Sequence, residues 1–89
     1  GAMGNAHAQL GSYQKAADFF ERAAQANPND LTSPRFLYKA GMMLEQANQL
    51  EDAQATLEQL RRDYRNSRYA REALKLIGRI EAQLSNTAS

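Results

Sequence analysis

The strongest constraint on this chain is an internal repeat of 37 residues. Under that shift, residues of similar character coincide along much of the chain. The matched pairs are Gly4 and Gly41, Gly11 and Asn48, Ala16 and Ala53, Phe20 and Leu57, and Ala23 and Leu60. Asn is the best replacement for Gly at a left-handed turn. A repeat of this length indicates one supersecondary unit stacked on a copy of itself.

The composition indicates that this unit is helical. The 89 residues include no Val and only two Ile, whereas strands favour β-branched residues. Ala, Leu, Gln, Glu and Arg dominate instead, and these are good helix formers. We therefore expect an all-α fold. The absence of Cys excludes disulfides, thiol nucleophiles and Cys-ligated zinc.

Turn signals divide the chain into five predicted helices. The breaks fall at residues 11–12, 27–30, 48–49 and 65–67, which leaves helices over about residues 4–10, 13–26, 34–47, 51–64 and 68–84. Ser12, Ser33 and Ser67 are the predicted N-caps, with Pro34 at a first helical position. Apolar residues recur three and four positions apart in the long helices, and the short connections predict antiparallel hairpins.

Residues 4–28 resemble a tetratricopeptide repeat (TPR). The residues at the family's signature spacings are Gly4, Gly11, Tyr13, Ala16, Phe20, Ala23 and Pro28. Residues 34–65 resemble a second, complete repeat through Leu37, Ala40, Gly41, Leu44, Leu50, Ala53 and Leu57. This second repeat departs from the pattern at Leu60, where the family has a small residue, and at Arg65, where it has Pro. Residues 64–74 resemble the start of a third repeat, but Lys75 replaces a close-packing small residue, which favours a capping helix.

The resemblance implies helical hairpins stacked in a right-handed superhelix of about five helices. The expected parts are a tag remnant (1–3), a truncated first repeat (4–32), a second repeat (33–66), a C-terminal capping helix (67–84) and a disordered tail (85–89). Gly41 and Ala53 are expected to let two helices approach closely, and Phe20 and Leu57 to fill the space between hairpins. Residues 29–41 more loosely resemble bacterial membrane-anchored TPR proteins that face the periplasm. That likeness implies a periplasmic location, with the cytoplasm as the alternative.

The resemblance also implies a protein-interaction scaffold that binds a protein or peptide segment in a concave groove, without catalysis or a cofactor. By family register, the groove positions are Asn5, Gln9, Arg35, Tyr38, Met42, Glu45, Tyr69 and Glu72. Tyr, Met and Arg are common at protein interfaces. The alternative for Tyr38 and Met42 is that both pack against the last helix.

Two other functions stay open. An uncovered apolar edge at Phe19 or Phe20 would favour self-association, either by pairing or by exchange of helices. Residues 61–79 are rich in Arg and carry Tyr64 and Tyr69 between the charges, a pattern found in binders of nucleic acid or anionic surfaces. A solvated helix face explains that stretch better, and we expect no nucleic acid and no membrane insertion. His7 is the single His, so the sequence predicts neither a metal site nor a catalytic triad.

Overall fold

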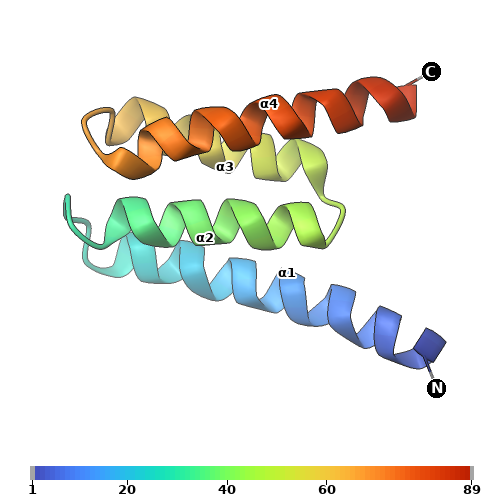
Figure 1. Ribbon diagram of the computed structural model, residues 1–89. Coiled ribbons are helices and arrows are strands. Elements are labelled where there is room, and N and C mark those ends of the chain that lie inside the picture. Colours follow the sequence, from blue (N-terminus) through green and yellow to red (C-terminus); the bar gives the residue numbers. More distant parts are fainter. Residues whose placement is uncertain (1, 89) are drawn as a thin grey trace.

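Over residues 2–88 the protein is a stack of four helices, each antiparallel to the next along the chain (Figure 1). The computed structural model describes the backbone of residues 2–88 and the side chains of residues 11–86. The helices are α1 (Ala2–Ala26), α2 (Ser33–Gln46), α3 (Leu50–Asp63) and α4 (Arg68–Ala88). Each helix packs against the next one along the chain, and α2 also contacts α4. The predicted all-α fold is confirmed, since residues 2–88 contain no strand.

The prediction of five helices is wrong because α1 runs without a break through Gly11 and Ser12. Gly11 does not have a positive φ, and Ser12 is an internal helical residue rather than an N-cap. A turn here would leave residues 4–10 as a helix of barely two turns, which is too short to be stable on its own. A Gly inside a helix costs only about 1 kcal/mol relative to Ala, so the continuous helix is favoured.

At the matching position in the second repeat, Asn48, the helix does end in a turn. Asn48 has a φ of 61°, and its N–H donates to the carbonyl of Glu45 at 3.0 Å. The next N–H, of Gln49, donates to the carbonyl of Leu44 at 2.8 Å. This pair of bonds is the Schellman arrangement that closes helix C-termini. The predicted left-handed turn at Asn48 is therefore confirmed.

Of the remaining helix ends, the start of α4 agrees with the prediction, whereas the start of α2 and the end of α4 differ from it. Ser67 does cap α4, because its Oγ accepts from the N–H of Tyr69 at 3.1 Å. Ser33, in contrast, is the first residue of α2 and Thr32 precedes the helix, so the predicted cap is off by one position. At the other end of the chain, α4 continues to Ala88, and residues 85–88 are helical where a disordered tail was expected.

The core lies between α2, α3 and α4. The side chains of Ala53, Leu57 and Leu60 on α3 are all fully buried. Leu57 packs directly over Gly41 of α2, where a Cβ atom would lie 2.5 Å from its Cδ2. Leu57 therefore packs within the α2–α3 hairpin, and it shares a core cluster with Ala73, Ile77 and Ile80 of α4. Phe20 does lie between hairpins, because its ring stacks on Phe36 of α2 at 6.2 Å between centroids.

The repeat-packing residues of α1 are less enclosed than their partners on α2 and α3. The side chains of Tyr13, Ala16, Phe20 and Ala23 are half-buried, and Gly11 and Pro28 are exposed. Among the described residues, apart from its chain neighbours and the backbone of its own helix, no atom lies within 4 Å of a Cβ built on Gly11. Gly4 lies outside the residues whose side chains are described.

Candidate functional site

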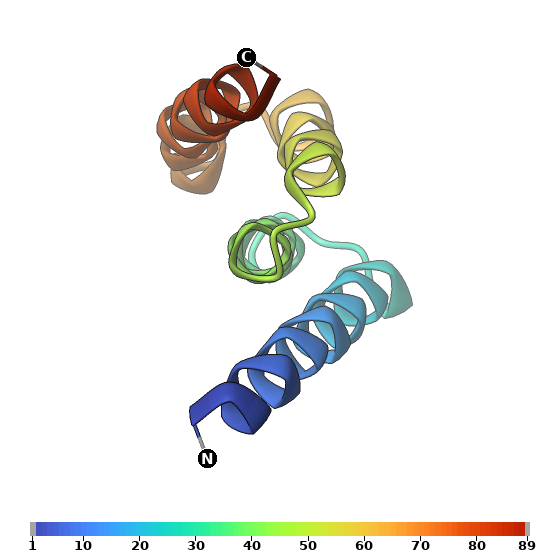
Figure 2. The same cartoon turned by 90° about the vertical axis from the view of Figure 1, so that its right-hand side faces the viewer.

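The helices α2 and α4 point in the same direction along one side of α3 (Figures 1 and 2). Several residues predicted to line a groove come together on this surface, which we call the α2–α4 face. Its residues are Arg35, Tyr38, Lys39, Met42, Glu45, Arg68, Tyr69 and Glu72. Asn5 and Gln9, the predicted groove positions on α1, lie outside the described side chains.

A pair of tyrosines occupies the middle of the α2–α4 face. The rings of Tyr38 and Tyr69 lie 5.8 Å apart between centroids at an angle of 44°, and both side chains are half-buried. Burial raises the pKa of Tyr38, and the nearby Glu72 carboxylate adds to the effect. Both rings also pack against the core, so Tyr38 does contact the last helix. Met42, one turn further along α2, is 37% exposed.

Positive charges act on Tyr69 of this pair. The guanidinium of Arg68 lies 5.2 Å from the Tyr69 ring centroid, and its Nη2 approaches the phenol oxygen at 3.4 Å. That hydrogen bond is the main cause of a lowered pKa at Tyr69, and the positive charges of Arg68, Arg35 and Lys39 lower it further. The N-terminal ends of α2 and α4 therefore share a positive potential beside an aromatic surface.

Glu45 has a structural role on this face. Arg79 of α4 donates two hydrogen bonds to the Glu45 carboxylate, from Nε to Oε2 at 2.8 Å and from Nη2 to Oε1 at 2.6 Å. Gln83 donates a third bond at 2.8 Å. The bond from Arg79 is the main reason that the pKa of Glu45 lies below its usual range, against the opposing effect of burial. This arrangement ties α2 to α4, so Glu45 is less available to a partner than its groove position implies.

The hairpin geometry agrees with the comparison of the sequence with protein families. The family model described as a tetratricopeptide repeat matches residues 7–80. The chain belongs to the tetratricopeptide repeat family. No curated protein and no solved structure matches it. In a TPR array the first helices of successive repeats line one face, and here those helices are α2 and α4. Membership of this family makes a protein-interaction scaffold the coarse functional assignment.

Sequence reasoning did not assign to this face two of its charged residues, Lys39 and Arg68, or Arg79, which binds Glu45 of the face. Lys39 lies one helical turn after Arg35, and its Nζ lies 5.6 Å from the ring centroid of Phe20. Arg68 precedes Tyr69 directly. Arg79 lies seven residues after Glu72, so helical spacing places both on one side of α4. That spacing was the available signal for Arg79, but nothing local in the sequence pairs it with Glu45.

The basic stretch over residues 61–79 does not form a single positive surface. Arg61 pairs with Glu58 at 3.4 Å, Arg62 lies 3.7 Å from Asp63, and Lys75 lies 3.8 Å from Glu72. These charges are divided between α3 and α4, and their carboxylate neighbours offset them. The pattern supports a solvated surface more than a nucleic-acid site.

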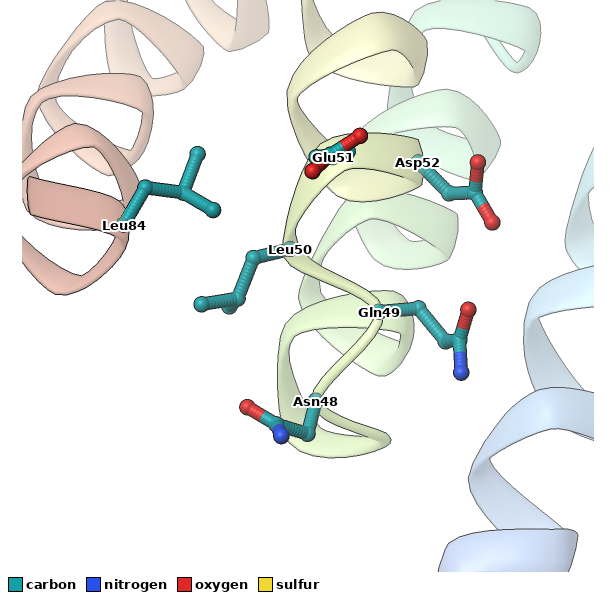
Figure 3. Close-up of a pocket in the computed structure, with 6 residues that line it drawn as sticks. All are labelled: Asn48, Gln49, Leu50, Glu51, Asp52 and Leu84. Carbon is teal, nitrogen blue, oxygen red and sulfur yellow. The ribbon is translucent and has the colours of Figure 1, made fainter. Parts of the chain in front are cut away.

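The hollows on the surface offer little chemistry. One, of about 370 Å³, opens beside the α2–α3 turn and the C-terminal half of α4 (Figure 3). Leu50 and Leu84 point toward one another across it, while the side chains of Gln49 and Asp52 point away. A second, of about 250 Å³, lies beside Tyr64 and Ser67 at the α3–α4 turn. No group of His, Asp and Glu side chains that could hold a metal ion occurs among the described residues. No helix within the described part is long and apolar enough to span a membrane.

Proposed function

We propose that the α2–α4 face binds an extended segment of a partner protein that carries carboxylates beside an aromatic or aliphatic side chain. One observation carries the proposal: Arg68 packs on the ring of Tyr69 in the half-buried Tyr38–Tyr69 pair, and the charges of Arg35 and Lys39 act on the same tyrosine. Cations steer an acidic segment toward the site, and the aromatic surface gives it a place to anchor. We propose binding alone, without catalysis, because Glu45 is held by Arg79, and Lys39 and Arg68 are packed on aromatic rings.

The side chains of the α2–α4 face have different roles in the proposed binding. Arg35 is exposed at the start of α2, so it can reach a carboxylate without disturbing the core. Lys39 and Arg68 are supported by the rings of Phe20 and Tyr69, which limits the entropy lost on binding. Met42 offers an adaptable apolar contact further along the face, since thioether side chains adjust to varied partners.

The test uses a fluorescein-labelled peptide of alternating Glu and Phe, with a peptide of alternating Lys and Phe as the comparison. Fluorescence polarisation should show binding of the acidic peptide alone, and binding should weaken as salt is raised. Arg35→Glu should weaken it about 10-fold, by replacing an attraction with a repulsion. NMR shift changes should concentrate on α2 and α4.

A matched control is available on α3. Arg62 is also an exposed cation near the end of a helix, but it lies away from the α2–α4 face. Arg62→Glu should leave the affinity for the acidic peptide unchanged. Equal losses in the two variants would show that only total charge matters. Equal binding of the acidic and basic peptides would also refute the proposal.

A further inference from the structure

The two repeats of this chain have different backbone conformations at the matching turn position. Residues 41–50 form a hairpin around Asn48, whereas the matching residues 4–13 continue straight through Gly11. In the second repeat, α2 folds back onto α3 and covers it. In the first, the matching segment projects past the end of α2 and away from the rest of the chain (Figure 1).

This difference leaves one side of α1 uncovered. Helix α3 packs between α2 and α4, whereas α1 packs on α2 and touches α3 through a side-chain hydrogen bond from Thr56 to Glu21. Ala53, Leu57 and Leu60 are fully buried, but their counterparts Ala16, Phe20 and Ala23 are only half-buried. The clearest case is Phe19, because its side chain is 65% exposed while that of its counterpart Thr56 is buried. A large ring exposed beside this stripe indicates a surface that another element covers.

The segment that fits this surface is present in the chain itself. In the 37-residue register, residues 4–10 correspond to 41–47, the part of α2 that covers α3. Gly4 takes the place of Gly41, over which Leu57 packs, so Phe20 would pack over Gly4 in the same way. Because α1 is straight, residues 4–10 lie away from this surface and cannot cover it within the same chain. The segment of a second copy can.

The charges on α1 permit two copies to approach. Residues 2–26 contain two cations, Lys15 and Arg22, and two anions, Asp18 and Glu21. Arg22 pairs with Asp18 at 3.1 Å, and Glu21 accepts a hydrogen bond from Thr56 at 2.9 Å. This helix therefore has no net charge to repel its own copy, and no excess charge to select an acidic or basic partner.

We propose that two copies of this chain exchange residues 4–10, so that each segment covers the Ala16, Phe20 and Ala23 stripe of the other copy. The exchange completes the first repeat of both chains and buries Phe19 at the edge of the contact. It is reciprocal and closed, so it yields a dimer rather than a filament. It uses a surface distinct from the α2–α4 face and does not depend on the function proposed there.

Light scattering after size exclusion, over a wide concentration series, gives the first test. The wild-type chain should run as a dimer. Phe19→Glu should raise the dissociation constant about 100-fold, because a charge replaces a buried ring. Leu74→Glu is the matched control, since Leu74 is 53% exposed on α4, and this variant should remain a dimer. Circular dichroism should show unchanged helix content in both. A monomeric wild type, or equal effects of the two variants, would overturn the proposal.

Disulfide trapping distinguishes exchange from simple pairing. The chain contains no Cys, so introduced thiols have no competitors. Under oxidation, the double variant with Gly4→Cys and Phe20→Cys should give a covalent dimer on a denaturing gel. A covalent monomer would mean that the hairpin closes within one chain, and the exchange would be wrong. The equivalent pair in the second repeat, Gly41→Cys with Leu57→Cys, should give a covalent monomer and so checks the chemistry.

Discussion

Replacing Gly41 by Ala should destabilise the protein, although Ala is the better helix former. A Cβ at position 41 would lie 2.5 Å from Cδ2 of Leu57, 2.7 Å from its Cγ and 3.2 Å from its Cδ1. Carbon atoms in contact prefer about 3.5–4.0 Å, so Leu57 would have to move by roughly 1 Å. Leu57 is fully buried, and the clash reaches its branching carbon as well as a terminal methyl. The Leu57 side chain therefore has little room to move away from the added methyl group.

Gly78 provides the matched comparison on α4. It is also a helical Gly, but apart from its chain neighbours and the backbone of its own helix, no atom of the described residues lies within 4 Å of a Cβ built there. Gly78→Ala should therefore gain about 0.5–1 kcal/mol from helix propensity alone. Gly41→Ala receives the same gain but adds an overpacking cost of about 2–3 kcal/mol, for a net loss of about 1–2 kcal/mol. At about 4–8 °C per kcal/mol, the two variants should shift the melting temperature in opposite directions.

The assay is thermal and urea unfolding followed by circular dichroism, at matched protein concentrations. A second background tests the cause. Leu57→Ala alone should cost about 2–5 kcal/mol, because it leaves a cavity. In that background Gly41→Ala should become neutral or stabilising, because the new methyl group enters the vacated space. A Gly41→Ala variant as stable as the wild type would refute the reasoning, as would a penalty that persists without the leucine.

Substitutions at three further positions test polar contacts and the left-handed turn of the fold. Ser33→Ala should cost about 1–3 kcal/mol in urea unfolding, since the buried hydroxyl donates to the Ala24 carbonyl at 2.9 Å and accepts from the Asn29 N–H at 3.1 Å. The lowered pKa of Glu45 means that the ionised carboxylate stabilises the fold above the usual Glu pKa, and that this contribution is lost as pH falls through the lower folded value. The free energy of unfolding, and with it the melting temperature, should therefore fall further on acidification in the wild type than in Glu45→Gln. The difference in free energy should be about 1 kcal/mol, because Arg79 is largely exposed. Asn48→Ala should cost about 1 kcal/mol at the left-handed turn, and Asn48→Gly should cost no stability.

Local patterns were sufficient to predict most of the helices. Apolar spacing and helix-favouring residues determine where a helix can form, and the stripe Ala53, Leu57 and Leu60 is buried as its periodicity predicts. The turn at Asn48 was also predictable, because few residues other than Gly accept a positive φ. Each of these features depends on residues that are close in sequence.

The features that were missed depend on distant residues. Gly11 can turn as readily as Asn48, and whether it does so depends on what lies across the helix. Ser33 has the residue type of an N-cap, but its hydroxyl donates nine residues back, to a carbonyl in the last turn of α1. The bond between Arg79 and Glu45 spans 34 residues and exists only because α2 and α4 pack side by side. None of these partners can be assigned from spacing along one helix.

The surfaces proposed for partner binding and for self-association come close together at Lys39, a residue of the α2–α4 face. Its Nζ lies 5.6 Å from the ring centroid of Phe20 on α1, and its charge also acts on Tyr69 of the α2–α4 face. A second copy that covers Phe20 would alter the support of this cation. An exposed cation–π contact is worth about 0.5–1 kcal/mol, so Phe19→Glu should change the affinity for the acidic peptide by about fivefold at most. In a Lys39→Ala background, Phe19→Glu should leave the affinity for the acidic peptide unchanged. A larger change that survives Lys39→Ala would mean that the two surfaces communicate through the helix packing of α1 and α2 instead.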